Sequence, residues 1–147
     1  MHETLSILLR HKGNDVYSVP PDATVAEAVT AMNRHHVGAV MVTDRDRPVG
    51  IFTERDVLRR VVGEGRDPAR TRVTEVMTRE LVAVRPSVTV AAAMAIITDK
   101  RCRHLPVVQD GELLGLVSSG DLTRWIGRGH EVQIQQLIEY VTNSYPA

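Results

Sequence analysis

The stretch GIFTERD at residues 50–56 recurs as GLVSSGD at residues 115–121, and this recurrence shows how the chain is organised. In each copy a glycine opens a short apolar run, a hydroxyl residue follows the run, and an aspartate stands three residues further on. The apolar run is typical of a buried strand, the hydroxyl of a helix N-cap, and the acid of the positive end of a helix dipole. The motif therefore predicts a strand-to-helix junction that occurs twice.

The two junctions belong to a longer internal repeat. Residues 16–59 align with residues 81–124 without a gap, so that Thr24 lies over Thr89 and both are predicted helix N-caps. Each threonine precedes apolar residues spaced three or four apart, which is the pattern of one helix face. These faces are Val25, Ala28, Val29 and Met32 in the first copy, and Val90, Ala93, Met94 and Ile97 in the second. Self-similarity of this kind indicates two copies of one structural unit.

The predicted unit runs strand, helix, strand, strand, helix. Short extended segments precede Pro21 and Pro86, because a residue before proline favours extended geometry. Polar turns then separate two predicted hairpins, with strands at residues 39–42 and 49–52, and at residues 105–108 and 113–117. The closing helices carry Val57, Leu58, Val61 and Val62 in the first copy, and Leu122, Trp125 and Ile126 in the second. Since one unit cannot cover its own sheet, we predict an α/β (α+β) fold of two units packed sheet to sheet with pseudo-two-fold symmetry.

The predicted domains follow the repeat. Residues 1–66 form the first repeat with a short N-terminal helix, which carries Leu5, Leu8 and Leu9. Residues 67–128 form the second repeat, and an exposed connector at residues 63–72, rich in Gly, Pro and Arg, spans the boundary between the repeats. Residues 129–147 form a C-terminal helix, expected from Glu131 to Thr142, and a tail. This helix is predicted either to cap the core or to contact a partner chain.

Composition argues against several classes of protein. The 147 residues contain 18 basic and 18 acidic side chains and only 3% aromatic residues, which disfavours a nucleic-acid binder. Cys102 is the single cysteine, and no signal peptide or bilayer-length apolar run is visible, so a cytoplasmic protein without a membrane segment is expected. Basic neighbours could lower the pKa of the Cys102 thiol, although an inert thiol is favoured. No nucleophile elbow, P-loop or dinucleotide fingerprint is present, so the chain is predicted not to be an enzyme, and no metal site is expected.

The repeated junction also has a functional interpretation beside the structural one. The free N–H groups of a helix N-terminus suit a phosphate, and the preceding hydroxyl adds a donor. The aspartate suits ribose hydroxyls, as acids do in dinucleotide-binding folds. Basic residues at 34–36 and 100–104 either complement helix C-termini or reach phosphates from across a cleft. A purely structural cap and a nucleotide site both remain open on these grounds.

The doubled junction, together with RHLPVV at residues 103–108 and VTEVMT at residues 73–78, resembles the CBS-domain family. Two such repeats form a Bateman module, and the resemblance implies a regulatory ligand in the cleft between them: AMP, ADP, ATP, NAD or S-adenosylmethionine. By position, one site would use Ile51, Thr53, Arg55 and Asp56, with backbone near Cys102 and Arg103. The other would use Leu116, Ser118 and Asp121, with a side chain of Arg103 or His104 and backbone near Val37 and Gly38. The first copy departs from the family pattern at Gly38, which removes a phosphate contact, so the two sites are expected to differ.

The resemblance thus predicts a stand-alone sensor that needs no cofactor, forms a homodimer and signals to an unknown regulated protein by conformational change. Replacing Asp56 or Asp121 by alanine is expected to weaken binding at its own site without unfolding the protein. The alternative is a dimerising protein-interaction module that binds no physiological nucleotide, in which the paired caps are purely structural.

Overall fold

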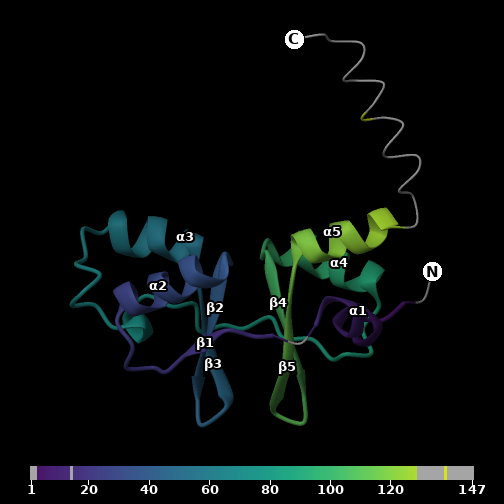
Figure 1. The fold of residues 1–147 in the computed structure, drawn as a ribbon, viewed down its shortest axis with the longest axis horizontal. Helices are drawn as coiled ribbons and strands as arrows, with labels where there is room; N and C mark the ends of the chain where they lie inside the picture. Colours follow the sequence, from purple (N-terminus) through teal and green to yellow (C-terminus); the bar gives the residue numbers. More distant parts are fainter. Residues whose placement is uncertain (1–2, 14, 129–137, 139–147) are drawn as a thin grey trace.

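The computed structural model describes residues 3–13, 15–128 and 138 of the chain (Figure 1). The predicted C-terminal helix, Glu131 to Thr142, lies outside these residues apart from Ile138. In chain order the elements are α1 (Leu5–Lys12), β1 (Ser18–Val19), α2 (Val25–His35), β2 (Ala39–Asp44), β3 (Arg47–Thr53), α3 (Glu54–Asp56), the π-helix η1 (Val57–Val62), the 3₁₀-helix η2 (Val73–Glu75), α4 (Val90–Lys100), β4 (His104–Gln109), β5 (Glu112–Ser118) and α5 (Ser119–Arg128). The predicted unit is confirmed, although the first strand of the second copy is reduced to a parallel bridge between Val84 and Val107.

The two hairpins have the same register and the same turn. In the first, β2 pairs antiparallel with β3 from Ala39 opposite Thr53, and β1 adds a parallel edge. In the second, β4 pairs with β5 from His104 opposite Ser118. Both tips place two consecutive residues at positive φ, which is the geometry of a tight two-residue hairpin turn. The tips point to one end of the molecule and α3 and α5 begin at the other, so the two strand-to-helix junctions share one end (Figure 1).

The long helices begin where the sequence predicts. The side chains of Thr24 and Thr89 accept hydrogen bonds of 3.1 Å from the backbone N–H groups of Glu27 and Ala92. Each cap satisfies a donor that the first helical turn leaves free. The buried positions of the two helices are Val25, Ala28 and Met32 in α2, and Val90, Ala93 and Ile97 in α4. The predicted apolar faces are therefore confirmed.

Each repeat has its own core, and a smaller cluster lies between the sheets. The first core surrounds Phe52, and the second surrounds Leu105 and Leu122, all of which are fully buried. Between the sheets, Ala39, Met41 and Ile51 are buried, with Val16, Leu81, Leu113 and Leu116 packed against them. The shared core predicted from the sequence is thus the smallest of three clusters, because α2 and α4 cover the outer faces of the sheets.

Two segments are exchanged between the repeats. Helix α1 precedes the first repeat, yet Leu5, Leu8 and Leu9 belong to the core of the second. Residues 73–78 precede the second repeat, yet Val73, Val76 and Met77 belong to the core of the first. We call α1 and residues 73–78 the exchanged segments. The predicted division into residues 1–66 and 67–128 follows chain order, whereas the packing of these segments crosses it.

Two glycines make this exchange possible at close range. A Cβ atom at Gly115 would lie 2.8 Å from a methyl carbon of Leu9, and one at Gly50 would lie 2.5 Å from the sulfur of Met77. These separations are shorter than normal van der Waals contacts. The repeated glycine is therefore the place where each sheet accepts the exchanged segment of the other repeat.

The closing helix of the first repeat differs from the prediction. After α3 the chain continues as η1, and the backbone N–H of Gly63 donates to the carbonyl of Leu58 at 2.9 Å, an i to i−5 bond. The wider turn leaves Leu58 and Val62 exposed at 66% and 67%, and only Val61 is fully buried. The predicted closing helix is therefore present, but two of the four apolar residues that it carries face solvent. None of the described helices combines the length and apolar composition that crossing a bilayer requires.

Candidate functional site

Both repeated motifs form reciprocal caps at the start of a helix. The hydroxyl of Thr53 accepts the backbone N–H of Asp56 at 3.3 Å, and the carboxylate of Asp56 accepts the N–H of Thr53 at 3.0 Å. In the second repeat, the hydroxyl of Ser118 accepts the N–H of Asp121 at 3.1 Å, and the carboxylate of Asp121 accepts the N–H of Ser118 at 2.8 Å. The structural interpretation of the motif, a capping box with an acid at the third position, is therefore confirmed in both copies.

Asp56 is enclosed by its own repeat and an exchanged segment. Its residue is only 4% exposed, and its oxygens also accept the hydroxyls of Thr53 at 3.2 Å and Thr78 at 3.2 Å. The guanidinium Nε of Arg60 lies 3.7 Å from the carboxylate oxygen that also accepts Thr78. Two backbone hydrogen bonds of 2.9 Å between Thr78 and Ile51 hold this cover in place. Since a carboxylate offers about four acceptor positions, Asp56 has little capacity left for a ligand.

Asp121 has a different cover. The ammonium of Lys12, the last residue of α1, lies 2.6 Å from its carboxylate and also donates to the backbone carbonyl of Leu116. The guanidinium of Arg124, which is 74% exposed, lies 2.7 Å from the other oxygen. Burial by itself would raise the pKa of Asp121, but hydrogen bonds from Lys12 and Ser118 outweigh burial and hold the pKa below its usual range. Asp121 is thus ionised and covered by two flexible side chains.

His104 lies between the two junctions. It pairs with Ser118 at the start of β4, and burial lowers its pKa, an effect that the charges of Asp121 and Glu54 only partly offset. Glu54 belongs to the other repeat, where its carboxylate rests against Gly38, 2.9 Å from where a Cβ atom would stand. The corresponding residues of the second repeat are Arg103 in place of Gly38 and Ser119 in place of Glu54. The first junction therefore has an acid where the second has a hydroxyl, and a glycine where the second has a base.

The remaining predicted residues divide into three environments. Ile51 and Leu116 meet in the cluster between the sheets, as expected of an apolar wall. Val37 and Cys102 pack against the cores of their own repeats, and Arg55 and Arg103 are exposed. Burial raises the pKa of the Cys102 thiol, which contradicts activation by its basic neighbours. Among the described residues, no group of His, Cys, Asp or Glu side chains is arranged to hold a metal ion.

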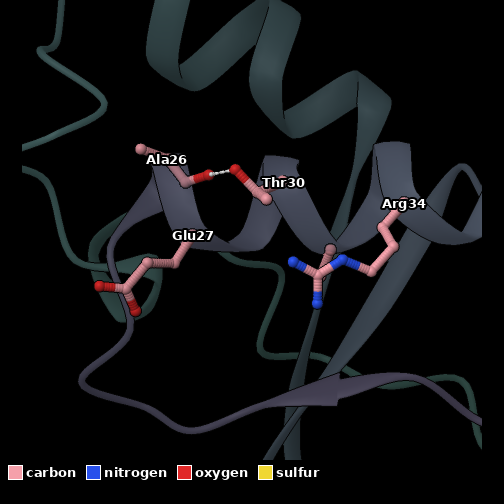
Figure 2. Close-up of a pocket in the computed structure, with 5 residues that line it drawn as sticks. Ala26, Glu27, Thr30 and Arg34 are labelled. Atoms are coloured by element: carbon pink, nitrogen blue, oxygen red, sulfur yellow. Dashed lines mark hydrogen bonds between the residues drawn. The ribbon is translucent and has the colours of Figure 1, made fainter.

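A hollow of about 360 Å³ lies elsewhere, along one face of α2. Figure 2 shows its lining, in which Glu27 and Arg34 extend from the helix and the hydroxyl of Thr30 donates to the carbonyl of Ala26 at 2.9 Å. Its fifth lining residue is Ala31. None of these side chains comes from the strand-to-helix junctions, so the hollow is separate from the candidate site.

Five residues that contact or flank the motif aspartates were not among the predicted site residues: Lys12, Glu54, Arg60, Thr78 and Arg124. Lys12 and Thr78 belong to the exchanged segments, and they occupy nearly equivalent positions just before the aligned part of each repeat. In the extended self-alignment Lys12 lies over Met77, one position before Thr78. No local sequence pattern indicates the exchange itself, because each segment packs against the sheet of the repeat to which it does not belong in the sequence.

The comparisons with known proteins agree with this architecture. The CBS domain family matches residues 10–63 and 73–128, and the chain therefore belongs to the CBS-domain family. Its fold is that of CBS-domain regulatory modules. The CBS domain-containing protein CBSX3, mitochondrial, of Arabidopsis thaliana is 36% identical over 151 residues, which span 97% of this chain and 73% of the relative.

Two solved structures of proteins from other organisms have the same fold. A CBS-domain containing protein from Agrobacterium tumefaciens superposes with a TM-score of 0.77 at 39% identity, covering 82% of this chain and 97% of its own. A CBS domain protein from Pyrobaculum aerophilum, complexed with AMP, superposes with a TM-score of 0.72 at 30% identity, covering 80% of this chain and 88% of its own.

Proposed function

We propose that this chain is a sensor of adenine-containing nucleotides, which bind as regulatory ligands where the two repeats meet. The observation that carries the proposal is the repeated capping box, which places a hydroxyl and a carboxylate at the start of a helix on both sides of the boundary between the sheets, with the Asp121 carboxylate covered by two flexible side chains. The AMP complex of the Pyrobaculum aerophilum protein supports a ligand of this class. Ligand binding changes the arrangement of the repeats to the extent that one arrangement binds more tightly.

The sensor is proposed to act as a homodimer on a separate protein. Exposed apolar side chains on the closing helices, Leu58 and Val62 on η1 and Ile126 on α5, support contact with a second chain. No cofactor and no catalytic step enter this proposal, and nucleic acid and membranes are not expected partners. A cytoplasmic location remains a prediction, while the plant relative carries the description mitochondrial.

Thermal unfolding with AMP, ADP, ATP, NAD and S-adenosylmethionine, each in excess, tests nucleotide binding. A ligand that binds only the folded state raises the unfolding midpoint in proportion to the logarithm of its concentration. We expect a shift with at least one of these compounds, and we expect Asp121→Asn to abolish it. Glu112→Gln, an exposed carboxylate at the start of β5, is the matched control and should keep the shift.

The alternative is a dimerising interaction module without a physiological nucleotide. It is favoured by one specific observation, namely that both motif aspartates already accept several hydrogen bonds from the chain itself. No midpoint shift with any of the five compounds, at concentrations up to several millimolar, would favour this alternative. The chain's oligomeric state and its protein partner would then be the next questions.

A further inference from the structure

We infer that the two repeat-related sites are unequal: the Asp56 site is permanently closed, and the Asp121 site is held by Lys12 until a nucleotide displaces it. The inference rests on the proposed nucleotide binding and adds the number of ligands per chain and the residue that controls access. It also names α1 as the element that carries this controlling residue.

Backbone contacts keep the Asp56 site closed. Thr78 covers Asp56, and the main chain of Thr78 forms two hydrogen bonds with Ile51. The backbone carbonyl of Met77, the residue before Thr78, accepts a hydrogen bond of 2.9 Å from the guanidinium of Arg60. Removing this cover means breaking a bridge between segments and exposing part of the first core, in which Met77 is 3% exposed.

Only side-chain contacts cover the Asp121 site. Lys12 reaches Asp121 and the carbonyl of Leu116 only through its flexible stem, and its side chain is 32% exposed. A ribose hydroxyl needs the same carboxylate that the ammonium occupies, so ligand and Lys12 compete. A partly exposed ion pair of this kind is worth about 1 kcal/mol or less, which a nucleotide can overcome. The competition lowers the apparent affinity by the fraction of molecules in which the site is open.

Displacement of Lys12 couples the site to α1. The preceding residue, His11, lies with its ring centroid 5.1 Å from that of Trp125, and the indole N–H of Trp125 donates to the carboxylate of Glu3, which precedes α1 in the chain. Trp125 is the single tryptophan of the chain, so it reports on the position of α1. The nucleotide therefore acts on the end of a helix that belongs, in sequence, to the opposite repeat.

Titration calorimetry with AMP and with ATP, on the full chain, tests the inference through Lys12→Met. We expect one site per chain and an apparent affinity about two- to sixfold tighter than that of the unmodified chain, because the competitor is gone. Arg10→Met removes another basic residue from the last turn of α1 and is expected to leave the affinity unchanged. Tryptophan emission excited at 295 nm should change on ligand addition to the original chain, and much less in the Lys12 variant.

The outcomes separate this inference from the function on which it rests. Weaker binding in Lys12→Met would make Lys12 a ligand contact, and two sites per chain would open the Asp56 site. Either result, or unchanged affinity, overturns the inference while leaving the nucleotide sensor standing. Absence of binding in both proteins overturns the sensor and this inference together, whereas binding in Lys12→Met alone supports both.

Discussion

Replacing Asp56 by alanine should destabilise the protein strongly. The side chain is almost completely buried and accepts the N–H of Thr53, the hydroxyls of Thr53 and Thr78, and a more distant contact from Arg60. Loss of a helix cap costs about 1 kcal/mol, and hydrogen bonds to a charged acceptor are worth about 1.5–3 kcal/mol each. These contributions overlap, and Arg60 can turn to solvent, so we expect a total loss of about 3 kcal/mol.

The assay is urea denaturation followed by circular dichroism, with linear extrapolation to water. A loss of about 3 kcal/mol should also lower the thermal midpoint by roughly 9 °C in a chain of this size. Asp56→Asn keeps one acceptor for the Thr53 N–H and should lose roughly half as much. Glu112→Ala, at an exposed position, should stay within about 0.5 kcal/mol of the original chain.

A loss below about 1 kcal/mol for Asp56→Ala would refute this reasoning, because it would mean that the hydrogen bonds to the enclosed carboxylate contribute little to the free energy of unfolding. The sequence-based expectation was that this substitution weakens binding at its own site without unfolding the protein, and the structure adds a large loss of stability to that expectation. If the Asp56 site is closed, the variant loses stability and keeps its nucleotide.

Three further predictions concern packing and pH. Gly115→Ala should lower the free energy of unfolding by about 1–3 kcal/mol, because the added methyl group clashes with Leu9. The same change should lower it less in a Leu9→Ala background, and equal losses in urea unfolding would contradict the contact. Leu8→Ala should cost about 2–5 kcal/mol in the same assay, whereas Ile7→Ala, at a position 36% exposed, should be nearly neutral; similar losses would contradict the packing of α1. Since burial lowers the pKa of His104 in the folded chain, the free energy of unfolding should fall as pH drops below about 6.5, where the unfolded chain takes up the proton first. His104→Gln should reduce this fall between pH 7.5 and 5.5, and an unchanged slope would assign it to other groups.

Much of the fold could be predicted because the repeat allowed each element to be checked twice. The N-caps at Thr24 and Thr89 and the buried faces of α2 and α4 agreed in both copies, since local spacing and capping determine them. The closing helix of the first repeat was predicted less well, because the apolar spacing around Leu58 and Val62 is also compatible with the wider η1 turn. The junctions were located correctly, but whether Asp56 and Asp121 are free or covered depends on Thr78 and Lys12. Those contacts are set by tertiary packing between segments far apart in the chain, and no local pattern specifies them.

The exchanged segments have a consequence for how the chain comes apart. Repeat proteins often lose their units one at a time, because each unit touches only its neighbours. Here α1 covers the second sheet and residues 73–78 cover the first, so unfolding either half strips buried leucines or valines from the other. The two repeats therefore melt as a single cooperative unit. A dimer of two half-length chains could have the same geometry, with the N-terminal segment of each chain packed against the sheet of the other across the two-fold axis.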